Sequence, residues 1–142
     1  MSDAGDVWLL MADLVLDNTR RRQVSEALGM SFGKTRALRR LARRPMSMGE
    51  FAAALDIDRP NATTVIADLE AQGLVRRRPH PTDGRAKVVE TTRKGKELAR
   101  RADEILATPP PGVEALTPED IETLHGILAS VSSGAHGGEP TT

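Results

Sequence analysis

The sequence predicts a mainly α-helical chain that carries one small β-hairpin. Apolar residues recur at helical spacing in several segments, and these segments begin at capping residues and end at glycine or proline. One basic segment, 74–92, instead holds β-branched residues around an Asp83-Gly84 turn signal. Two short helical patterns precede it directly. The order over residues 46–92 is therefore helix, turn, helix, hairpin, which predicts a winged helix-turn-helix unit of the kind that reads DNA.

Length and composition fit one domain without disulfides. The chain has 142 residues, of which 39% are hydrophobic but only 2% aromatic, so its core must be aliphatic, and a core shared between two chains would help to stabilise it. The absence of cysteine excludes disulfides, thiolate metal sites and thiol-based redox sensing. We find no signal peptide and no apolar run of membrane-spanning length, and we expect a cytoplasmic protein that does not enter a membrane.

The charges are segregated along the chain, although the formal net charge is zero. Residues 20–48 hold nine basic side chains and one acidic, and residues 76–101 hold ten basic and three acidic. Residues 1–19 hold four acids and residues 102–142 hold seven, and neither segment holds a base. A basic middle of this kind is typical of a surface that neutralises phosphates and releases counterions.

The first segment, 6–16, reads DVWLLMADLVL and is apolar nearly all round. Such a helix is buried on several sides, and a chain of this size could hardly surround it, so we expect a partner chain to cover it. The helix is expected to continue through the arginine triplet 20–22 and to stop at Gly29. The triplet is equally compatible with a solvated face and with DNA or interface contacts.

The next helix is expected to open near Ser31 and to be closed by Pro45. In winged-helix proteins this element supports the recognition helix. Its outward arginines are compatible with phosphate contacts, with solvation and with pairing to acids of the chain ends. The inward residues are Phe32, Thr35, Leu38 and Leu41, and the outward ones are Lys34, Arg36, Arg39, Arg40 and Arg43.

The first helix of the helix-turn-helix is predicted over Met48–Leu55. Ser47 followed three residues later by Glu50 forms a capping box, in which each residue satisfies a free backbone N–H of the other. The apolar residues repeat at helical spacing and would face a core. They are Phe51, Ala52, Leu55 and, just beyond the helix, Ile57.

The second helix is predicted to begin near Asp58 or Arg59, with Pro60 in its first turn, and to end at Gly73. Its apolar face consists of Ala62, Val65, Ile66 and Leu69. The other face, toward the helix start, carries short hydrogen-bonding side chains and one arginine. These residue types fit against base edges and phosphates when a helix enters a major groove. They are Arg59, Asn61, Thr63 and Thr64.

Residues Leu74–Pro79 and Lys87–Thr92 are expected to pair as the strands of the hairpin. Arg85 follows the turn signal directly, so its guanidinium would be carried at the tip and could enter a minor groove. Asp83 could hold that arginine by a bidentate pair. The residues expected to bind DNA are, together, Arg59, Asn61, Thr63, Thr64, Arg76, Asp83, Arg85 and Lys87.

After the hairpin, Thr92 is expected to cap a helix that runs to about Ala107. Its buried stripe would be Leu98, Ala102, Ile105 and Leu106. Prolines 109–111 predict an extended break, and Thr117-Pro118 with two following acids predicts the start of a last helix. Residues 135–142 are expected to be a disordered tail. The apolar side of the last helix consists of Ile121, Leu124, Ile127, Leu128 and Val131.

Residues 55–95, LDIDRPNATTVIADLEAQGLVRRRPHPTDGRAKVVETTRKG, resemble the recognition helix and wing of the MarR family of bacterial transcriptional regulators. The motifs that carry the resemblance are the helix end at 69–75, the Asp83-x-Arg85 wing, and the pair Thr92 and Gly95. The resemblance covers most of the chain in order, with strong motifs over about a third. One departure is Thr64, where many members carry a basic residue, and this puts its part in phosphate binding in doubt.

The resemblance implies a single domain over 1–134, with dimerisation helices at 6–29 and 93–133 around a winged helix-turn-helix unit at 31–92. It implies a homodimer that binds double-stranded DNA at a pseudo-palindromic operator, most often as a repressor. It also implies release by a small phenolic or other aromatic anion bound between the dimer helices and the DNA-binding unit. Residues that could line such a pocket, although they suit an ordinary core better, are Trp8, Met11, Met30, Phe32 and nearby arginines.

An enzyme is not expected, because the chain has no cysteine or tyrosine, no phosphate-cradling glycine loop and no serine beside a plausible base. The histidines, His80, His125 and His136, are far apart and lack metal-ligand spacing, so no metal and no cofactor is expected. The remaining alternative is a winged-helix module that binds proteins and not DNA. Only a DNA reader must lose duplex affinity steeply as salt rises.

Overall fold

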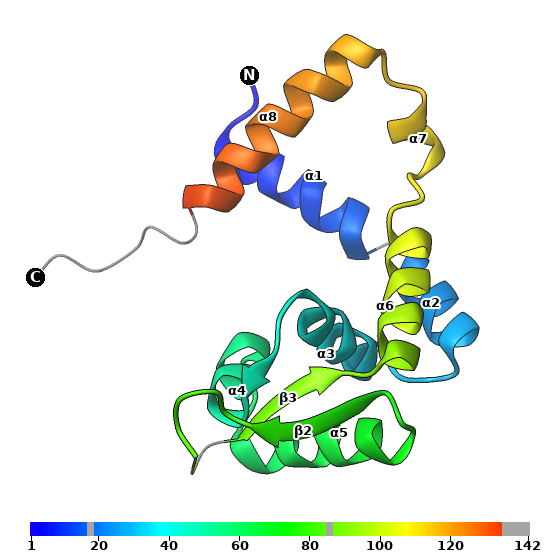
Figure 1. Ribbon diagram of the computed structural model, residues 1–142. Coiled ribbons are helices and arrows are strands. Elements are labelled where there is room, and N and C mark those ends of the chain that lie inside the picture. The colour runs from blue at the N-terminus through cyan, green and yellow to red at the C-terminus, as the bar shows by residue number, and fades with distance from the viewer. Residues whose placement is uncertain (17–18, 85–86, 135–142) are drawn as a thin grey trace, which may run out of the picture. The chain divides into compact units, whose positions relative to one another are not determined.

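The computed structural model describes residues 1–16, 19–84 and 87–134 (Figure 1). The chain divides into two compact units, the first over residues 1–107 and the second from Thr108 onward. The first unit holds α1 (Ala4–Leu16), α2 (Arg20–Leu28), α3 (Phe32–Arg43), β1 (Met46–Ser47), α4 (Met48–Leu55), α5 (Arg59–Ala71), β2 (Val75–Pro79), β3 (Lys87–Thr91) and α6 (Arg93–Leu106). The second holds α7 (Pro111–Glu114) and α8 (Pro118–Gly134).

The strands form one antiparallel sheet in the order β1-β3-β2. In the hairpin, Val75 pairs with Thr91, and Pro79 pairs with Lys87. On the other side of β3, Met46 pairs with Val89. The predicted fold class, mainly helical with a small β wing, is confirmed. The short strand β1 was not predicted, because two residues are too few to show a period.

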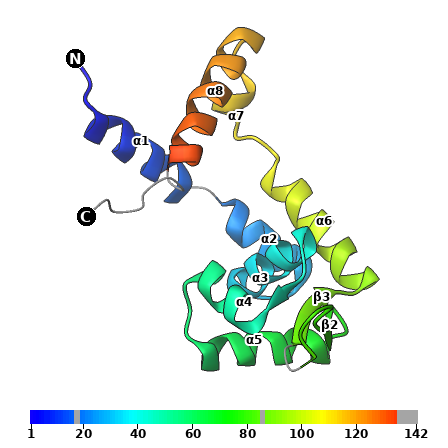
Figure 2. The ribbon, with the colours of Figure 1, turned by 60° about the vertical axis from the view of Figure 1, so that its left-hand side comes forward.

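Helices α3, α4, α5 and α6 pack against this sheet, and in both views α5 lies at the lower edge of the unit (Figures 1 and 2). The core between them is aliphatic apart from Phe51, as the composition requires. Thr35, a polar side chain that is completely buried, donates its hydroxyl to the Ser31 carbonyl oxygen at 3.1 Å. The largest fully buried residues are Phe51, Leu38, Leu41, Ile66, Leu69, Leu74, Val24, Val89 and Thr35.

Four helices of the first unit begin at the capping residues that the sequence predicts. The side chains of Ser31, Ser47, Asp58 and Thr92 each accept a hydrogen bond from the backbone N–H three residues later. Each bond satisfies a backbone donor that the helix itself leaves free. Local sequence signals therefore determine where α3, α4, α5 and α6 start.

α1 ends at Leu16 and α2 begins at Arg20. The expected continuation of the first helix passes through residues 17–18, which lie outside the described part. The predicted stop is confirmed: Gly29 has φ 67° and its N–H bonds to the Ser25 carbonyl oxygen at 2.9 Å.

The expectation of an extended break over prolines 109–111 is wrong at its last residue. Pro111 opens the single-turn helix α7, because proline is tolerated at the first helical position, where its missing N–H has no helical partner. α8 follows with Thr117 accepting a hydrogen bond from the Asp120 N–H at 3.1 Å. The expected tail, 135–142, lies outside the described residues.

The helices α1 and α8 have no buried residue in the single chain. On α1, Trp8 is 66% and Leu10 64% exposed, and on α8, Ile127 is 56% exposed. Most apolar residues of both helices thus remain accessible to solvent. In the part of the chain that the structure describes, no helix is both long enough and apolar enough to cross a membrane.

Candidate nucleic-acid interface

The start of α5 presents four polar side chains to solvent on a helix whose other face is buried. Ala62, Ile66 and Leu69 are completely buried in the core, so the orientation of the helix is fixed. The four residues predicted to meet DNA are all exposed: Arg59, Asn61, Thr63 and Thr64. The structure therefore brings them together on one surface.

Asp58 fixes the Asn61 side chain as well as the helix start. One carboxylate oxygen accepts the Asn61 backbone N–H at 2.8 Å, and the other accepts the Asn61 side-chain N–H at 3.0 Å. Because a carboxylate only accepts, the amide nitrogen of Asn61 must face Asp58. Its carbonyl oxygen and its second N–H remain available.

The hydroxyls of Thr63 and Thr64 are turned back onto their own helix. Thr63 donates to the Arg59 carbonyl oxygen at 2.9 Å, and Thr64 donates to the Pro60 carbonyl oxygen at 3.1 Å. Each hydroxyl proton is therefore used within the protein. This bonding to the residue four positions earlier is a common use of threonine within helices.

Arg59 is the first residue of α5 and lies against the neighbouring helix. Its Nη2 atom is 3.3 Å from the position that a Cβ would occupy at Gly49, so the small residue in α4 leaves room for the guanidinium. Between the two helices, Asp56 takes the left-handed conformation with φ 53°, and the Ile57 N–H bonds to the Ala52 carbonyl oxygen at 3.1 Å. This tight turn sets α5 relative to α4.

The end of α5 is a Schellman motif at the predicted glycine. Gly73 has φ 72°, its N–H bonds to the Glu70 carbonyl oxygen at 3.0 Å, and the Leu74 N–H bonds to that of Leu69 at 2.9 Å. A residue with a side chain would be strained there. Gly73 therefore directs the chain from the recognition helix into the wing.

Thr92 and Gly95 clasp this turn against the start of α6. The Thr92 hydroxyl donates to the Gly73 carbonyl oxygen at 2.6 Å, and the Thr92 N–H donates to that of Leu74 at 3.0 Å. A Cβ on Gly95 would lie 2.0 Å from the Leu74 carbonyl oxygen, which no side chain can tolerate. The spacing Thr92-x-x-Gly95 thus has a structural cause.

The arginines of β2 are paired with acids, which was not predicted. Glu90 on β3 accepts from the Nε of Arg76 at 2.8 Å and from the Nε of Arg78 at 2.7 Å. These bonds, first that of Arg78, hold the pKa of Glu90 below its usual value. Arg77 lies 3.5 Å from Glu70 of α5. Arg76 was expected to bind DNA, and although 68% exposed it already has an anionic partner.

His80 fixes the turn that leads toward the wing tip. Its Nδ1 accepts the backbone N–H of Thr82 at 3.2 Å and that of Asp83 at 3.1 Å. The expected pair between Asp83 and Arg85 cannot be placed, because Arg85 lies outside the described residues. Lys87 begins β3 with an exposed side chain.

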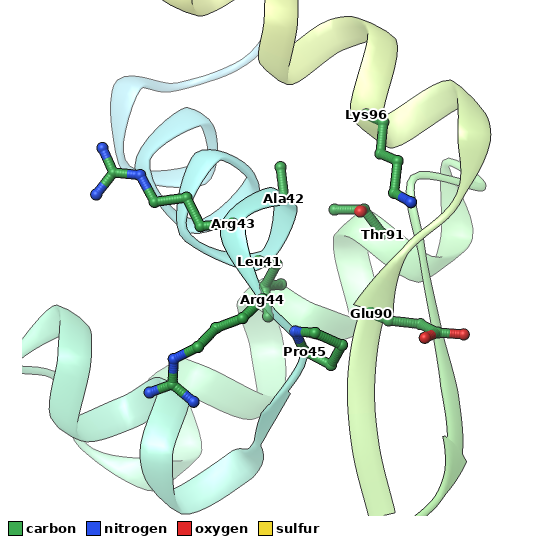
Figure 3. Close-up of a pocket in the computed structure, with 8 residues that line it drawn as sticks. All are labelled: Leu41, Ala42, Arg43, Arg44, Pro45, Glu90, Thr91 and Lys96. Atoms are coloured by element: carbon green, nitrogen blue, oxygen red, sulfur yellow. The ribbon is translucent and has the colours of Figure 1, made fainter.

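Arg44 bonds to the first turn of α4. Its Nη1 bonds to Glu50 at 2.8 Å, and Figure 3 shows Arg44 extending toward α4 while Arg43 points away from β3. This bond is the main cause of a lowered pKa at Glu50, and hydrogen bonds with Ser47 lower it further, as the predicted capping box requires. On α3, Lys34 pairs with Asp68 at 3.2 Å, and Arg39 pairs with Asp103 at 2.5 Å.

Two cavities among the described residues are small and lined mostly by polar groups. One of about 170 Å³ lies between the end of α3, β3 and Lys96 of α6 (Figure 3). Another, of about 130 Å³, is lined by arginines of α3. Of the residues named for an effector pocket, Met30 is buried in the core, and Phe32 lies under Arg21, whose guanidinium carbon is 4.9 Å from the ring centre.

Among residues 1–16, 19–84 and 87–134, no group of three or more histidine, aspartate or glutamate side chains could hold a metal ion. His80 is engaged in the wing turn described above.

The helix-turn-helix and wing lie in the part of the chain that matches known proteins by sequence. A family model described as the MarR family matches residues 28–86. The chain is 38% identical over 74 residues to HTH-type transcriptional regulators of Mycobacterium leprae, described as uncharacterized, and of Mycobacterium tuberculosis. The matched segment covers 51% of this chain and spans only about half the length, 52%, of each of these relatives.

Solved structures resemble the chain over nearly its whole length. Wild-type MarR from E. coli in its apo form has a TM-score of 0.72 at 19% identity, and the match covers 92% of this chain and 98% of MarR. NadR in complex with 4-hydroxyphenylacetate has a TM-score of 0.68 at 24% identity, with 92% and 93% covered. AbsC, a MarR family transcriptional regulator from Streptomyces coelicolor, has a TM-score of 0.65 at 20% identity, with 97% and 99% covered.

At these identities the solved structures establish the fold, and the family model shows a relationship to the MarR family over residues 28–86. The match over 28–86 contains the capped helices α3, α4 and α5, the Gly73 turn and most of the wing. The resemblance read from the sequence is thereby confirmed. Over residues 28–86, which hold the helix-turn-helix and most of the wing, the chain matches the MarR family.

Proposed function

We propose that the chain is a sequence-specific DNA-binding transcriptional regulator that binds a pseudo-palindromic duplex as a homodimer. The observation that carries the proposal is the start of α5, where four polar side chains are exposed together while the opposite face is locked in the core. A helix held in this way offers fixed hydrogen-bonding groups to base edges in a major groove. The regulators that match by sequence support the same function.

The proposed DNA contacts divide into three kinds. Asn61, Thr63 and Thr64 would face the bases, and Arg59 and Lys87 would neutralise phosphates. Arg85 would enter the minor groove beside the wing, held by Asp83. Arg76 would contribute least, because Glu90 already neutralises part of its charge.

The dimer is proposed from the exposed apolar surface of the helices at both ends. A second chain would cover side chains such as Trp8, Leu10 and Ile127, which water surrounds in the single chain. The corresponding segments are 6–29 and 93–133 of one domain over 1–134. Two α5 helices would then lie in successive major grooves, about one turn of DNA apart. The regulator would act as a repressor in the cytoplasm, where bacterial DNA is found.

Release by a small aromatic anion is the second part of the proposal. The solved NadR complex contains 4-hydroxyphenylacetate. In the present chain, Arg21 over Phe32 places a cation beside an aromatic ring, a combination that suits a phenolic carboxylate. Adding 4-hydroxyphenylacetate or benzoate to the DNA complex tests it: a specific effector weakens duplex binding at a concentration where acetate does not.

Binding to duplex DNA as a function of salt tests the whole proposal. Fragments of genomic DNA retained by the purified protein should be released steeply between low and moderate salt, because each neutralised phosphate releases a counterion. Absence of duplex affinity at low salt would overturn the proposal. It would favour a winged-helix module that binds proteins instead.

A further inference from the structure

We propose that α5 reads A·T base pairs, through the methyl groups of Thr63 and Thr64 and through the amide of Asn61. The half-site of the operator would then carry thymines where the two threonines meet the groove. The reading of A·T pairs rests on the proposed DNA binding and adds to it the class of sequence that is recognised.

The threonine hydroxyls are poorly placed to read bases by donating a hydrogen bond. Both protons are given to helix carbonyl oxygens at 2.9 and 3.1 Å. With each oxygen turned toward the backbone, the other branch of the side chain, the methyl group, is the part that projects from the exposed helix face. Thr63 and Thr64 therefore offer the DNA two adjacent apolar groups.

Only thymine presents a methyl group in the major groove. Cytosine, the other pyrimidine, presents an amino group there, which an apolar methyl would strip of water without replacing its hydrogen bond. Neighbouring methyl groups on α5 thus favour thymine over cytosine at the positions they contact. An arginine or lysine at these positions would instead favour guanine or a phosphate.

Asn61 adds a preference for adenine over guanine. Adenine offers one donor and one acceptor on its major-groove edge, whereas guanine offers two acceptors. Because one side-chain N–H of Asn61 is held by Asp58 at 3.0 Å, the amide has one N–H and its oxygen left. One donor and one acceptor match adenine. Guanine, with two acceptors, would place one of its lone pairs against the amide oxygen of Asn61.

The test begins with a random-sequence duplex pool, from which the purified protein retains its best binders in low salt. The tightest duplex is then made with deoxyuridine in place of each thymine, which removes only the methyl group. Three proteins are compared: the wild type, Thr63→Ser, which keeps the hydroxyl and loses the methyl, and Thr63→Val, which keeps a methyl and loses the hydroxyl. The same pair of variants at Thr64 repeats the comparison, and circular dichroism checks that these exposed substitutions leave the fold intact.

We expect thymine in the selected half-sites and a loss of about fourfold in affinity for the deoxyuridine duplex, the factor for burial of one methyl-sized group. Thr63→Ser should show this loss on the thymine duplex and no further loss on deoxyuridine, while Thr63→Val, which keeps a methyl group, should still bind the deoxyuridine duplex more weakly than the thymine duplex. If the protein bound the thymine and deoxyuridine duplexes tightly and equally, the A·T reading would be overturned. The same would follow if Thr63→Val lost affinity and Thr63→Ser did not. In either case the proposed function would stand. A pool from which nothing is retained would overturn both.

Discussion

The helix-turn-helix with its wing finds its packing partners within one chain, whereas the two end helices leave their apolar surfaces exposed. In the first, every helix start is capped, the apolar face of α5 is buried, and the wing carries its own ion pairs. In α1 and α8, by contrast, no residue is buried. The surface proposed to read DNA is thus held by contacts within one chain, whereas the end helices present the surface that, as proposed, a second chain would cover. Substitutions in the two regions should therefore fail in different ways.

The largest effect is expected at the clasp between α5 and α6. Gly95→Ala places a Cβ 2.0 Å from the Leu74 carbonyl oxygen, so the backbone must move and the unit should lose at least about 3 kcal/mol of unfolding free energy. Gly33→Ala is the matched control, since its Cβ would meet only the Ser31 Oγ at 4.0 Å. Urea unfolding followed by circular dichroism measures both. Equal stability of the two variants would show that the clasp tolerates a side chain.

The next effect is expected on association and not on folding. Leu10→Glu places a charge on the exposed apolar surface of α1, where Leu10 is 64% exposed in the single chain. If that surface is buried in a dimer, the dissociation constant should rise at least about tenfold, because burial of a leucine contributes about 1.5–3 kcal/mol. Sedimentation measures the mass, and Asp13→Asn on the same helix is the control. A variant that unfolds, or that dimerises like the wild type, would contradict the division of the molecule drawn above.

Removing the cation at the start of α5 should weaken DNA binding without affecting either folding or association. Arg59→Ala is expected to reduce duplex affinity by about 1–3 kcal/mol, because the guanidinium lies at the end of the helix that enters the groove. Arg100→Ala is the matched control, since Arg100 of α6 is already paired with Glu97 and Glu104. Titration of a retained duplex compares them. A larger loss for Arg100 would place the DNA on another face of the protein.

The smallest effect is expected in acid. The pKa of Glu90 is lowered in the folded chain from its ordinary 4.5, so its contribution to stability is complete above pH 4.5 and is lost as the pH falls through the lowered value. Glu90→Gln should therefore cost up to about 1 kcal/mol at pH 7 and lose less stability than the wild type below pH 4.5. Glu50, whose pKa is also lowered, would keep part of the acid sensitivity. Identical urea midpoints of the two proteins at every pH would refute a role of Glu90 in holding the wing.

The features that the sequence predicts depend on contacts between residues that are near in sequence, and most of those it does not predict depend on contacts between distant residues. Ser47, Asp58 and Thr92 were recognised as caps because each acts on a backbone three residues away. Gly29 and Gly73 were recognised as stops for a similar reason. The exposed face of α5 also follows from spacing alone, since Ala62, Ile66 and Leu69 leave only one side to the polar residues.

The features that were missed depend on register or on very short segments. Glu90 meets Arg76 only because the hairpin pairs these two residues across the strands, and the sequence alone did not establish that register. A two-residue strand and a one-turn helix at Pro111 carry too few residues for a periodic signal.

The most direct test of the account measures binding to a retained duplex at several salt concentrations, together with the number of chains bound, for the wild type and for Leu10→Glu. We expect two wild-type chains on each duplex and an affinity that falls steeply with salt, while Leu10→Glu remains folded and binds far more weakly. A single chain on the duplex, or an affinity that is equal in both proteins or insensitive to salt, would contradict it.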